Sequence, residues 1–273
     1  MLRDVEARVI SNTRLSADYN VIALAAPEIA ETTQPGQFVM VKSGRGGDPL
    51  LRRPFSVFEV LRSNNGIEGL TLLSKRVGVT TRILFDAVEG DTIACLGPLG
   101  RPFEIVDPPA RAWMVAGGVG LAPFATLAEA LIERGTETTL FYGARTGGEL
   151  FYLDWFKSRG IRLVLATEDG SIGDHARITG PLERELQTAA QTELMIYACG
   201  PEPMLEAVAR VAAKFERPSQ VSVERTMGCG MGGCYSCIIP VRDGGSDKVR
   251  PTHHYVRSCI AGPVFRSEDI VWD

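Results

Sequence analysis

Four of the six cysteines in this 273-residue chain have the spacing of metal ligands. Cys229, Cys234 and Cys237 are arranged as C-x4-C-x2-C, and Cys259 follows after twenty-one intervening residues. A [2Fe–2S] cluster requires four thiolates, and its plant-type ligands have this order with a distant fourth cysteine. Structural zinc also accepts four cysteines, but it usually takes two separate C-x2-C pairs, and only Cys234 and Cys237 form such a pair here. The spacing predicts a [2Fe–2S] cluster, with zinc as the main alternative and disulfides as a weaker one.

The loop that carries these cysteines is rich in glycine. Gly228, Gly230, Gly232 and Gly233 would let the chain wrap closely around a cluster and point backbone N–H groups at sulfur. Such N–H groups spread the negative charge of a cluster and help to set its potential. Cys95, in the apolar segment IACLG, is interpreted instead as a buried filler.

A glycine turn earlier in the chain could bind a dinucleotide. The segment VAGGVGLAPF ends a strand pattern and opens a helical one, so that N–H groups near Gly117, Gly118 and Gly120 would face a crevice suited to a pyrophosphate. Pro123 replaces the third glycine of the full fingerprint and suits the first turn of a helix. Tight packing alone is the alternative explanation of this turn.

A second turn of the same kind lies in the segment YACGPEPML. It places Cys199, Gly200 and Pro201 between another strand and another helix. Ligands of open parallel sheets bind at the carboxyl ends of the strands. The two turns therefore predict one cleft at that edge of the sheet.

Charged residues beyond a third strand bear on the choice of nucleotide. Glu168 and Asp169 could bond ribose hydroxyls but would repel an additional 2′-phosphate, which favours NADH over NADPH. Arg145 could pair with such a phosphate and argues the other way. All three could equally be solvated loop charges.

The segment PLLRRPFSVFEV contains a candidate flavin site. Arg53, Pro54, Phe55 and Ser56 would present a guanidinium, a fixed backbone and a hydroxyl together at the start of a strand. This combination suits the phosphate and the ring edge of a flavin. A surface arginine without a ligand is the alternative.

A second anion site is predicted in the segment SKRVGVTTRIL. Gly78, Thr80 and Thr81 would lie at a helix amino terminus, where free N–H groups attract phosphate. An ordinary threonine N-cap is the alternative. The predicted cofactor-binding set also includes Leu73 and Ser74, at the end of the preceding strand.

The elements that must position these residues divide the chain into three parts. Six short alternating segments before residue 107 predict an antiparallel β-barrel, with a tight turn at Asn65 and Gly66 and one helix over 80–88. After Asp107 the apolar strands alternate with helical patterns, which predicts a parallel-sheet α/β domain. The expected domains are residues 1–106, 107–220 and 221–273, the last holding the cluster.

Composition limits the function classes. A formal net charge of −4 with scattered basic residues argues against nucleic-acid binding. The amino terminus has no signal-like apolar core, and the longest uncharged run, 112–128, is broken by glycine and proline, so no membrane segment is expected. Clustered thiols without an export signal favour the reducing cytoplasm.

The order of these motifs resembles that of the ferredoxin-NADP reductase superfamily, in which a barrel holds FAD and an α/β domain holds the nicotinamide nucleotide. The segments MGCGMGGCYSC and RSCIAGPVF narrow the resemblance to the electron-transfer subunits of class 1B dihydroorotate dehydrogenases, across essentially the whole chain. The resemblance implies that the R-P-F-S strand and the glycine–threonine helix start bind FAD and that the glycine loop takes NAD(H). It places Cys199 beside the nicotinamide, as a contact and not as a nucleophile.

The same resemblance implies an electron path. NADH releases two electrons as a hydride and an iron–sulfur cluster accepts them singly, so a flavin must convert between them. The implied partner is an FMN-containing catalytic subunit that oxidises dihydroorotate in pyrimidine biosynthesis, in a heterotetramer with two copies of each subunit. Two alternatives remain: a related reductase that serves a ferredoxin, a hydrogenase or a transhydrogenase complex, and a non-enzymatic redox-sensing metal protein.

Overall fold

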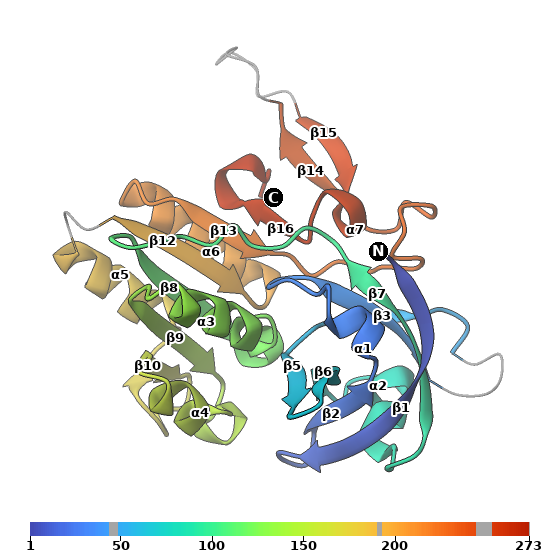
Figure 1. The fold of residues 1–273 in the computed structure, drawn as a ribbon. Coiled ribbons are helices and arrows are strands. Elements are labelled where there is room, and N and C mark those ends of the chain that lie inside the picture. Colours follow the sequence, from blue (N-terminus) through green and yellow to red (C-terminus); the bar gives the residue numbers. More distant parts are fainter. Residues whose placement is uncertain (44–48, 190–192, 244–252, 273) are drawn as a thin grey trace.

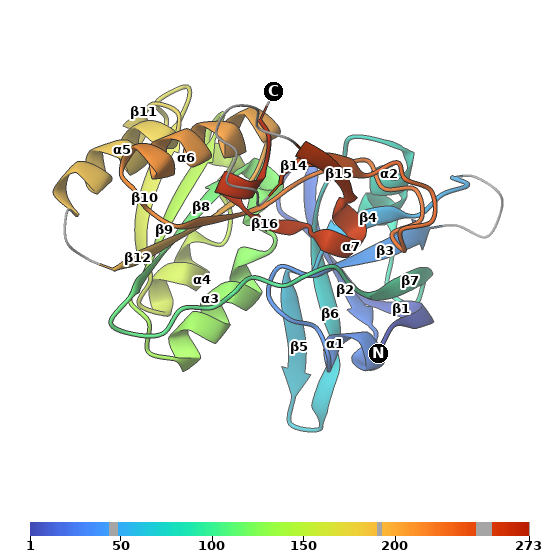
Figure 2. The same cartoon turned by 90° about the horizontal axis from the view of Figure 1, so that it is seen from above.

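A computed structural model describes residues 1–43, 49–189, 193–243 and 253–272. The described chain forms two seven-stranded sheets and one two-stranded sheet. The first large sheet curls into a half-barrel beside the layered α/β part, and the carboxyl-terminal segment lies against both (Figures 1 and 2).

The first sheet is antiparallel and has the order β4-β3-β7-β1-β2-β6-β5. Its edge strands β4 and β5 are consecutive in the chain and are separated only by Val57 and Phe58. Val57 N–H donates to the Gln37 carbonyl, and Phe58 N–H donates to the Thr71 carbonyl. This short link draws the two edges together and curls the sheet. The strands are β1 (Arg3–Arg14), β2 (Tyr19–Ala25), β3 (Phe38–Ser43), β4 (Arg53–Ser56), β5 (Glu59–Ser63), β6 (Gly66–Lys75) and β7 (Thr92–Leu99).

The predicted antiparallel barrel is therefore confirmed, with two differences of detail. One of the six alternating segments, FSVFEVL over 55–61, is divided between two strands at the link between β4 and β5. The tight turn falls on Asn64 and Asn65, because Gly66 already pairs with Ser63 in the ladder. The helix expected over 80–88 is α2 (Val79–Asp86), and the short helix α1 (Pro27–Ala30) packs near β6 and β7.

The second sheet has the order β11-β10-β9-β8-β12-β13-β16, and all its neighbouring strands are parallel except the pair β13 and β16. Its central strands alternate between two apolar cores: Met114 joins the core under α3 and α4, and Val115 joins the core under α5 and α6. Burial on both faces explains their continuous apolar sequence. The strands are β8 (Arg111–Gly117), β9 (Thr138–Ala144), β10 (Arg162–Thr167), β11 (Asp174–His175), β12 (Leu194–Cys199), β13 (Ser219–Ser222) and β16 (Val264–Arg266). The helices are η1 (Gly118–Leu121), α3 (Phe124–Glu133), η2 (Gly147–Glu149), α4 (Leu153–Ser158), α5 (Thr179–Thr188) and α6 (Glu202–Lys214).

The carboxyl-terminal segment is built into both larger parts. It contains the hairpin β14 (Ile238–Arg242) and β15 (His253–Arg257), the helix α7 (Ser258–Ala261), the edge strand β16 and the short helix η3 (Ser267–Asp269). Cys237 and Cys259 share a small buried core with Met40 and Leu99 of the curled sheet. The boundary expected between residues 220 and 221 falls inside β13.

No helix in the described part of the chain combines the length and the low polarity that crossing a bilayer requires.

Candidate functional site

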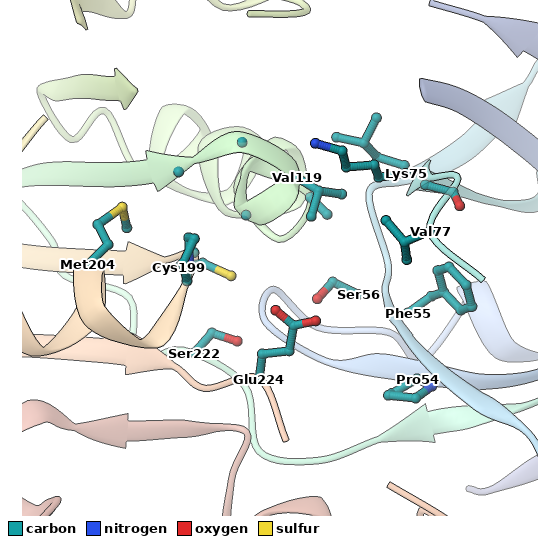
Figure 3. Close-up of a pocket in the computed structure, with 18 of the residues that line it drawn as sticks. Pro54, Phe55, Ser56, Lys75, Val77, Val119, Cys199, Met204, Ser222 and Glu224 are labelled. Atoms are coloured by element: carbon teal, nitrogen blue, oxygen red, sulfur yellow. The ribbon is translucent and has the colours of Figure 1, made fainter. Parts of the chain in front are cut away.

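A cavity of about 1230 Å³ lies between the curled sheet and the α/β sheet. Residues from both sheets line it (Figure 3). The structure brings together here every predicted cofactor-binding residue except Asp169. The predicted residues that line the cavity are Arg53, Pro54, Phe55, Ser56, Leu73, Ser74, Gly78, Thr80, Thr81, Gly117, Gly118, Gly120, Glu168, Cys199, Gly200 and Pro201.

The edge strand β4 supplies the wall on the side of the curled sheet. Its register places Ser56 opposite Phe38 and Arg53 opposite Val41. Nη1 of Arg53 donates to the carbonyls of Leu51 (3.0 Å) and Arg52 (3.1 Å). The other donors of that guanidinium are left for a ligand in the cavity.

The amino terminus of α2 forms a second part of the same wall. Oγ1 of Thr81 accepts the N–H groups of Val77 and Gly78, both at 2.9 Å, and its hydroxyl lies 3.1 Å from the Gly78 carbonyl. The Thr81 hydroxyl is therefore committed to the helix start itself. The N–H groups of the first turn have no partner within the helix and are the groups that can bind an anion.

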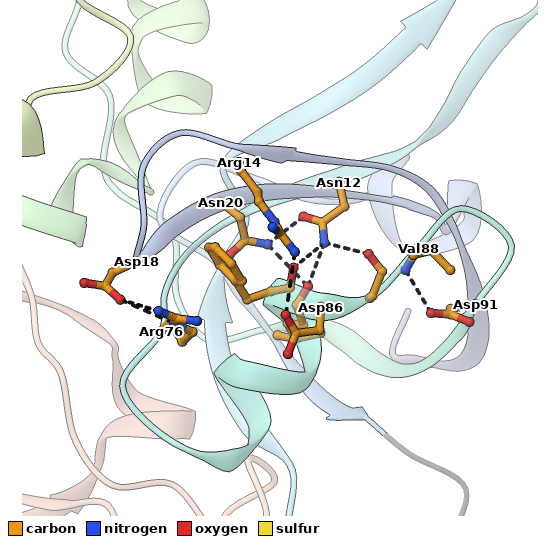
Figure 4. Close-up of polar contacts among 11 residues, drawn as sticks. Asn12, Arg14, Asp18, Asn20, Arg76, Asp86, Val88 and Asp91 are labelled. Atoms are coloured by element: carbon orange, nitrogen blue, oxygen red, sulfur yellow. Dashed lines mark hydrogen bonds and ion pairs between the residues drawn. The ribbon is translucent and has the colours of Figure 1, made fainter.

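The opposite end of α2 is fastened to the curled sheet by Asn12, which the sequence reasoning did not identify. Nδ2 of Asn12 donates to the carbonyls of Leu84 (2.9 Å), Phe85 (3.1 Å) and Ala87 (2.8 Å), as Figure 4 shows. Asn20 Nδ2 donates in turn to Asn12 Oδ1 at 2.7 Å. These bonds satisfy carbonyls that a helix end leaves open and fix the axis of α2.

The glycine loop after β8 faces this wall across the cavity. Gly118 has φ +53°, a left-handed conformation that favours glycine. Among the described residues other than its chain neighbours, only the Tyr19 hydroxyl lies within 4 Å of the Cβ position that a substitution would add. At Gly120 an added Cβ would collide with the carbonyl of Cys199. Gly118 therefore leaves the loop open to the cavity, whereas Gly120 lets it pack against the C-G-P turn.

Cys199, Glu224 and Ser56 all line the cavity, and Figure 3 shows their side chains. Burial, followed by the nearby Glu224 carboxylate, raises the pKa of the Cys199 thiol to about 12. The thiol is therefore protonated at neutral pH, and a protonated thiol is a poor nucleophile. Glu224 lies five residues before Cys229 in the sequence, but nothing in its spacing distinguished it from a surface charge.

An ion pair joins the two halves of the cavity. Lys75 Nζ lies 2.9 Å from Glu149 Oε1, and the Tyr19 hydroxyl donates to the same oxygen at 3.1 Å. Burial raises the pKa of Glu149, but hydrogen bonds from Lys75 and Tyr19 outweigh it, so the pKa is lowered overall. The Tyr19 ring also packs against Phe151, with centroids 4.9 Å apart. The sequence contained no local pattern for this contact, because its partners are 74 and 130 residues apart.

The far end of the cavity carries the charges predicted to select the nucleotide. Glu168 and Arg145 line it, together with Arg177, which the sequence reasoning did not identify. Asp169 does not line the cavity. Its Oδ1 accepts the N–H (3.0 Å) and the hydroxyl (2.6 Å) of Ser171, which lower its pKa. Asp169 thus stabilises its own turn, and a ribose contact from it is not supported.

The cysteine loop begins where the cavity ends, since Met227, Gly228 and Ser236 also line it. Cys229 Sγ accepts the N–H groups of Met231 (3.4 Å) and Gly233 (3.2 Å). The neighbouring Ser236 hydroxyl, 3.1 Å from Cys234 Sγ, lowers the pKa of Cys234 to about 6.

The four predicted ligands differ in exposure. Cys237 and Cys259 are buried, Cys229 is half-buried and Cys234 is exposed. Among the residues that the structure describes, no three cysteine, histidine or acidic side chains converge tightly enough to be recognised as a metal site from their positions alone. The all-thiol donor set and the N–H groups directed at sulfur nevertheless suit an iron–sulfur cluster. Cys95 is fully buried in β7, apart from these four, as predicted.

A curled antiparallel sheet facing a parallel α/β sheet across a large cavity, with a cysteine loop at one end, defines a ferredoxin reductase-like oxidoreductase. Two family models match the chain: "Oxidoreductase NAD-binding domain" over residues 114–210, and "Iron-sulfur cluster binding domain of dihydroorotate dehydrogenase B" over residues 224–271.

Two similar proteins show to which family within this class the chain belongs. The dihydroorotate dehydrogenase B (NAD(+)) electron transfer subunit of Desulforamulus reducens is 34% identical over 273 residues and is matched over its full length and that of this chain. The corresponding subunit of Bacillus caldolyticus is 37% identical, with 97% of this chain and 98% of that protein covered. The chain belongs to the family of dihydroorotate dehydrogenase B electron transfer subunits.

A solved structure of an NADH-dependent reduced ferredoxin-NADP oxidoreductase is also similar. It has a TM-score of 0.81 and 27% identity, and covers 98% of this chain and 91% of that one. A ferredoxin reductase of carbazole 1,9a-dioxygenase has a TM-score of 0.67 and 25% identity, with 80% and 67% covered.

Proposed function

We propose that this chain transfers electrons between NAD(H) and an FMN-containing dihydroorotate dehydrogenase catalytic subunit, through FAD and a [2Fe–2S] cluster. The observation that carries the proposal is the continuity of one cavity. It extends from the glycine loop at Gly118, past Ser56 on β4, to Gly228 and Ser236 beside the cysteines. Binding sites for a hydride donor, a flavin and a cluster thus lie along a single path.

The residues of the chain have separate tasks along that path. Arg53 and the first-turn N–H groups of α2 bind the phosphates of FAD, and the glycine loop binds the nicotinamide nucleotide. When bound, FAD supplies the exchange between hydride transfer and single-electron transfer. The protonated Cys199 thiol packs at the meeting point, and the N–H groups at Cys229 stabilise the negative charge on sulfur.

The proposed partner follows from the names of the relatives. Their name describes an electron transfer subunit of a larger enzyme, and we infer a heterotetramer with two copies of each subunit. Exposed apolar side chains lie on the cysteine loop and beside it: Met231 is 55%, Tyr235 62% and Ile260 48% exposed. They offer a face on which the FMN-containing subunit can dock, and the proposed location is the reducing cytoplasm.

A second candidate is a related reductase subunit with a different partner. It is favoured by the similarity, over 98% of this chain, to the NADH-dependent reduced ferredoxin-NADP oxidoreductase structure. The two candidates share the same cofactors and differ only in the electron acceptor.

One experiment tests both the cofactors and the partner. The purified chain is prepared anaerobically, its absorption and EPR spectra are recorded, and NADH-dependent dye reduction is measured. The chain is then mixed with an FMN-containing dihydroorotate dehydrogenase subunit. The proposal expects flavin and cluster signals, dye reduction, and dihydroorotate-dependent reduction of NAD⁺ by the mixture. Dye reduction without any effect on dihydroorotate oxidation would favour the second candidate, and the absence of flavin would contradict both.

The Arg53→Ala variant tests the flavin contact. It should retain less FAD after gel filtration, because a charge-assisted phosphate contact is lost. The matched control is Arg8→Ala, an exposed arginine on β1 that does not line the cavity. Equal FAD retention in both variants would remove Arg53 from the site.

A further inference from the structure

The cysteine loop contains one hydroxyl that lies between the cofactor cavity and a predicted cluster ligand. Oγ of Ser236 is 3.1 Å from Cys234 Sγ, and the same oxygen accepts the Gly228 N–H at 3.0 Å. Ser236 and Gly228 line the cavity, whereas Cys234 does not. The hydroxyl therefore contacts the cluster site from the side on which the cavity lies.

The chemistry of the two groups fixes the direction of this hydrogen bond. A serine hydroxyl has one proton to donate and lone pairs with which to accept. The Gly228 N–H already uses the oxygen as an acceptor. A cysteine that ligates a metal is a thiolate, which can accept a hydrogen bond but cannot donate one. With a cluster in place, Ser236 is thus the donor and Cys234 Sγ is the acceptor.

Ser236 differs from the other donors at the ligand sulfurs. Cys229 Sγ accepts the backbone N–H groups of Met231 and Gly233, at 3.4 Å and 3.2 Å. Every residue except proline carries such an N–H, so these donors persist through most substitutions. Among the described residues, the Ser236 hydroxyl is the only side-chain group, apart from the cysteines themselves, that hydrogen-bonds a ligand sulfur. It is therefore the donor that a change of side chain can remove.

The loop is also anchored independently of this hydroxyl. Nη1 of Arg257 donates to the Gly232 carbonyl at 2.7 Å, and its guanidinium lies 4.8 Å from the centroid of the Tyr235 ring. These two contacts tie the loop to β15 on both sides of Cys234. Removal of the Ser236 hydroxyl should therefore alter the electrostatics at sulfur more than the position of the loop.

We propose that the Ser236 hydroxyl donates a hydrogen bond to Cys234 Sγ and thereby raises the reduction potential of the cluster. This inference rests on the proposed [2Fe–2S] cluster. Reduction adds one negative charge, so a donor at sulfur stabilises the reduced cluster more than the oxidised one. Ser236 is exposed, so water competes for the same sulfur and the effect is moderate. A higher potential favours electron transfer to the cluster from a reduced flavin in the cavity.

The test is a potentiometric titration of the protein loaded with FAD and cluster, followed by EPR of the reduced cluster. Ser236→Ala should lower the midpoint potential by about a threefold change in the equilibrium constant, which is ~28 mV for one electron. Ser236→Thr keeps the hydroxyl and should stay within about 1.5-fold of wild type. Iron and acid-labile sulfide per chain should be unchanged in both variants.

Tyr235→Phe is the matched control, because it removes a hydroxyl from the adjacent residue and keeps the ring that contacts Arg257. Among the described residues, the Tyr235 hydroxyl makes no hydrogen bond to a cysteine. Its removal should therefore leave the equilibrium constant within about 1.5-fold of wild type.

Three results would overturn the inference. The first is a potential in Ser236→Ala that stays within about 1.5-fold of wild type. The second is an equal shift in Ser236→Thr or Tyr235→Phe. The third is loss of iron from Ser236→Ala, because the hydroxyl would then hold the loop together and not tune the sulfur. A wild-type protein without iron and acid-labile sulfide would instead refute the proposed function, so the two failures are distinguishable.

Discussion

Lys75 Nζ lies 2.9 Å from Glu149 Oε1. This contact joins β6 of the curled sheet to the short helix η2 of the α/β part, and both residues line the cavity. Both side chains are partly buried, at 32% and 23% exposure. A pair in such surroundings is less screened than one on the open surface. It therefore helps to fix how closely the two halves approach.

Lys75→Met should slow the reduction of FAD by NADH severalfold, because the carboxylate of Glu149 loses its cation and the two halves lose a point of attachment. Stopped-flow absorbance of the flavin measures this rate. In a double-mutant cycle with Glu149→Gln, the effects of the two substitutions on the activation free energy of flavin reduction should be non-additive by about 0.5 kcal/mol or more. The exposed pair Arg134 and Asp107, at 42% and 70% exposure, is the control. Fully additive effects would show that the contact does not position the halves.

Glu59 is expected to destabilise the protein as pH rises. Burial, and then the nearby Glu129 carboxylate, raise the pKa of Glu59 in the folded state. The folded protein therefore holds more protons than the unfolded chain between the two pKa values, and stability falls as pH increases through this window. Glu59→Gln should raise the Tm at pH 8 and have little effect near pH 4, where both states are mostly protonated.

Thermal unfolding followed by circular dichroism at these two pH values measures the effect. Glu68→Gln, an exposed residue of β6, is the control and should show no such dependence. A Glu59→Gln protein with the same Tm difference from wild type at both pH values would contradict the assignment.

Asn12→Ala should weaken FAD retention although Asn12 does not line the cavity. It removes the donor that holds three carbonyls at the end of α2, while the start of that helix lines the cavity and is the proposed phosphate site. We expect a loss of about 1–3 kcal/mol in the free energy of unfolding. Asn12→Asp should be worse, since it directs a carboxylate at the same carbonyls. The measurements are the Tm and the FAD content after dialysis. If Asn12→Asp equalled wild type in both, α2 would not depend on this residue.

Cys237→Ser and Cys259→Ser should abolish the cluster and leave the flavin in place. Iron and acid-labile sulfide per chain should fall to near zero, while FAD content and NADH-dependent dye reduction persist, because a dye can accept electrons directly from flavin. Cys95→Ala should keep its iron, since Cys95 lies apart from the loop in β7. Stoichiometric zinc in wild-type protein without iron or sulfide would refute the cluster.

Those features that depend on neighbouring residues in the sequence could be predicted. The parallel sheet follows from apolar strands buried on both faces, and the two glycine turns lie where strands end, so they meet at one edge. The cysteine spacing is a local pattern of the same kind. Placement of Ser56, Thr80 and Gly118 around one cavity follows from these short-range signals.

Features that depend on distant contacts could not be predicted. Asn12 meets α2 across more than seventy residues, and Lys75 meets Glu149 across 74. Neither contact produces a periodic or local pattern in the amino-acid sequence. For Asp169 the local sequence was ambiguous, because a carboxylate just after a strand suits a ribose contact and an Asx turn equally well. The structure favours the turn, since Ser171 N–H donates to the Asp169 carboxylate.

The strand β16 also constrains how the protein is made. Val264 to Arg266 complete the edge of the α/β sheet by pairing with β13, and the fourth cysteine, Cys259, lies just before them on α7. Domains usually fold during synthesis from the amino terminus onward. Here a nascent chain must be translated past Arg266 before the α/β sheet gains β16, and past Cys259 before the cysteine loop gains its fourth thiol. The metal centre therefore cannot be completed while only the two larger sheets' earlier strands have been made, and a product cut short before Cys259 would lack both features.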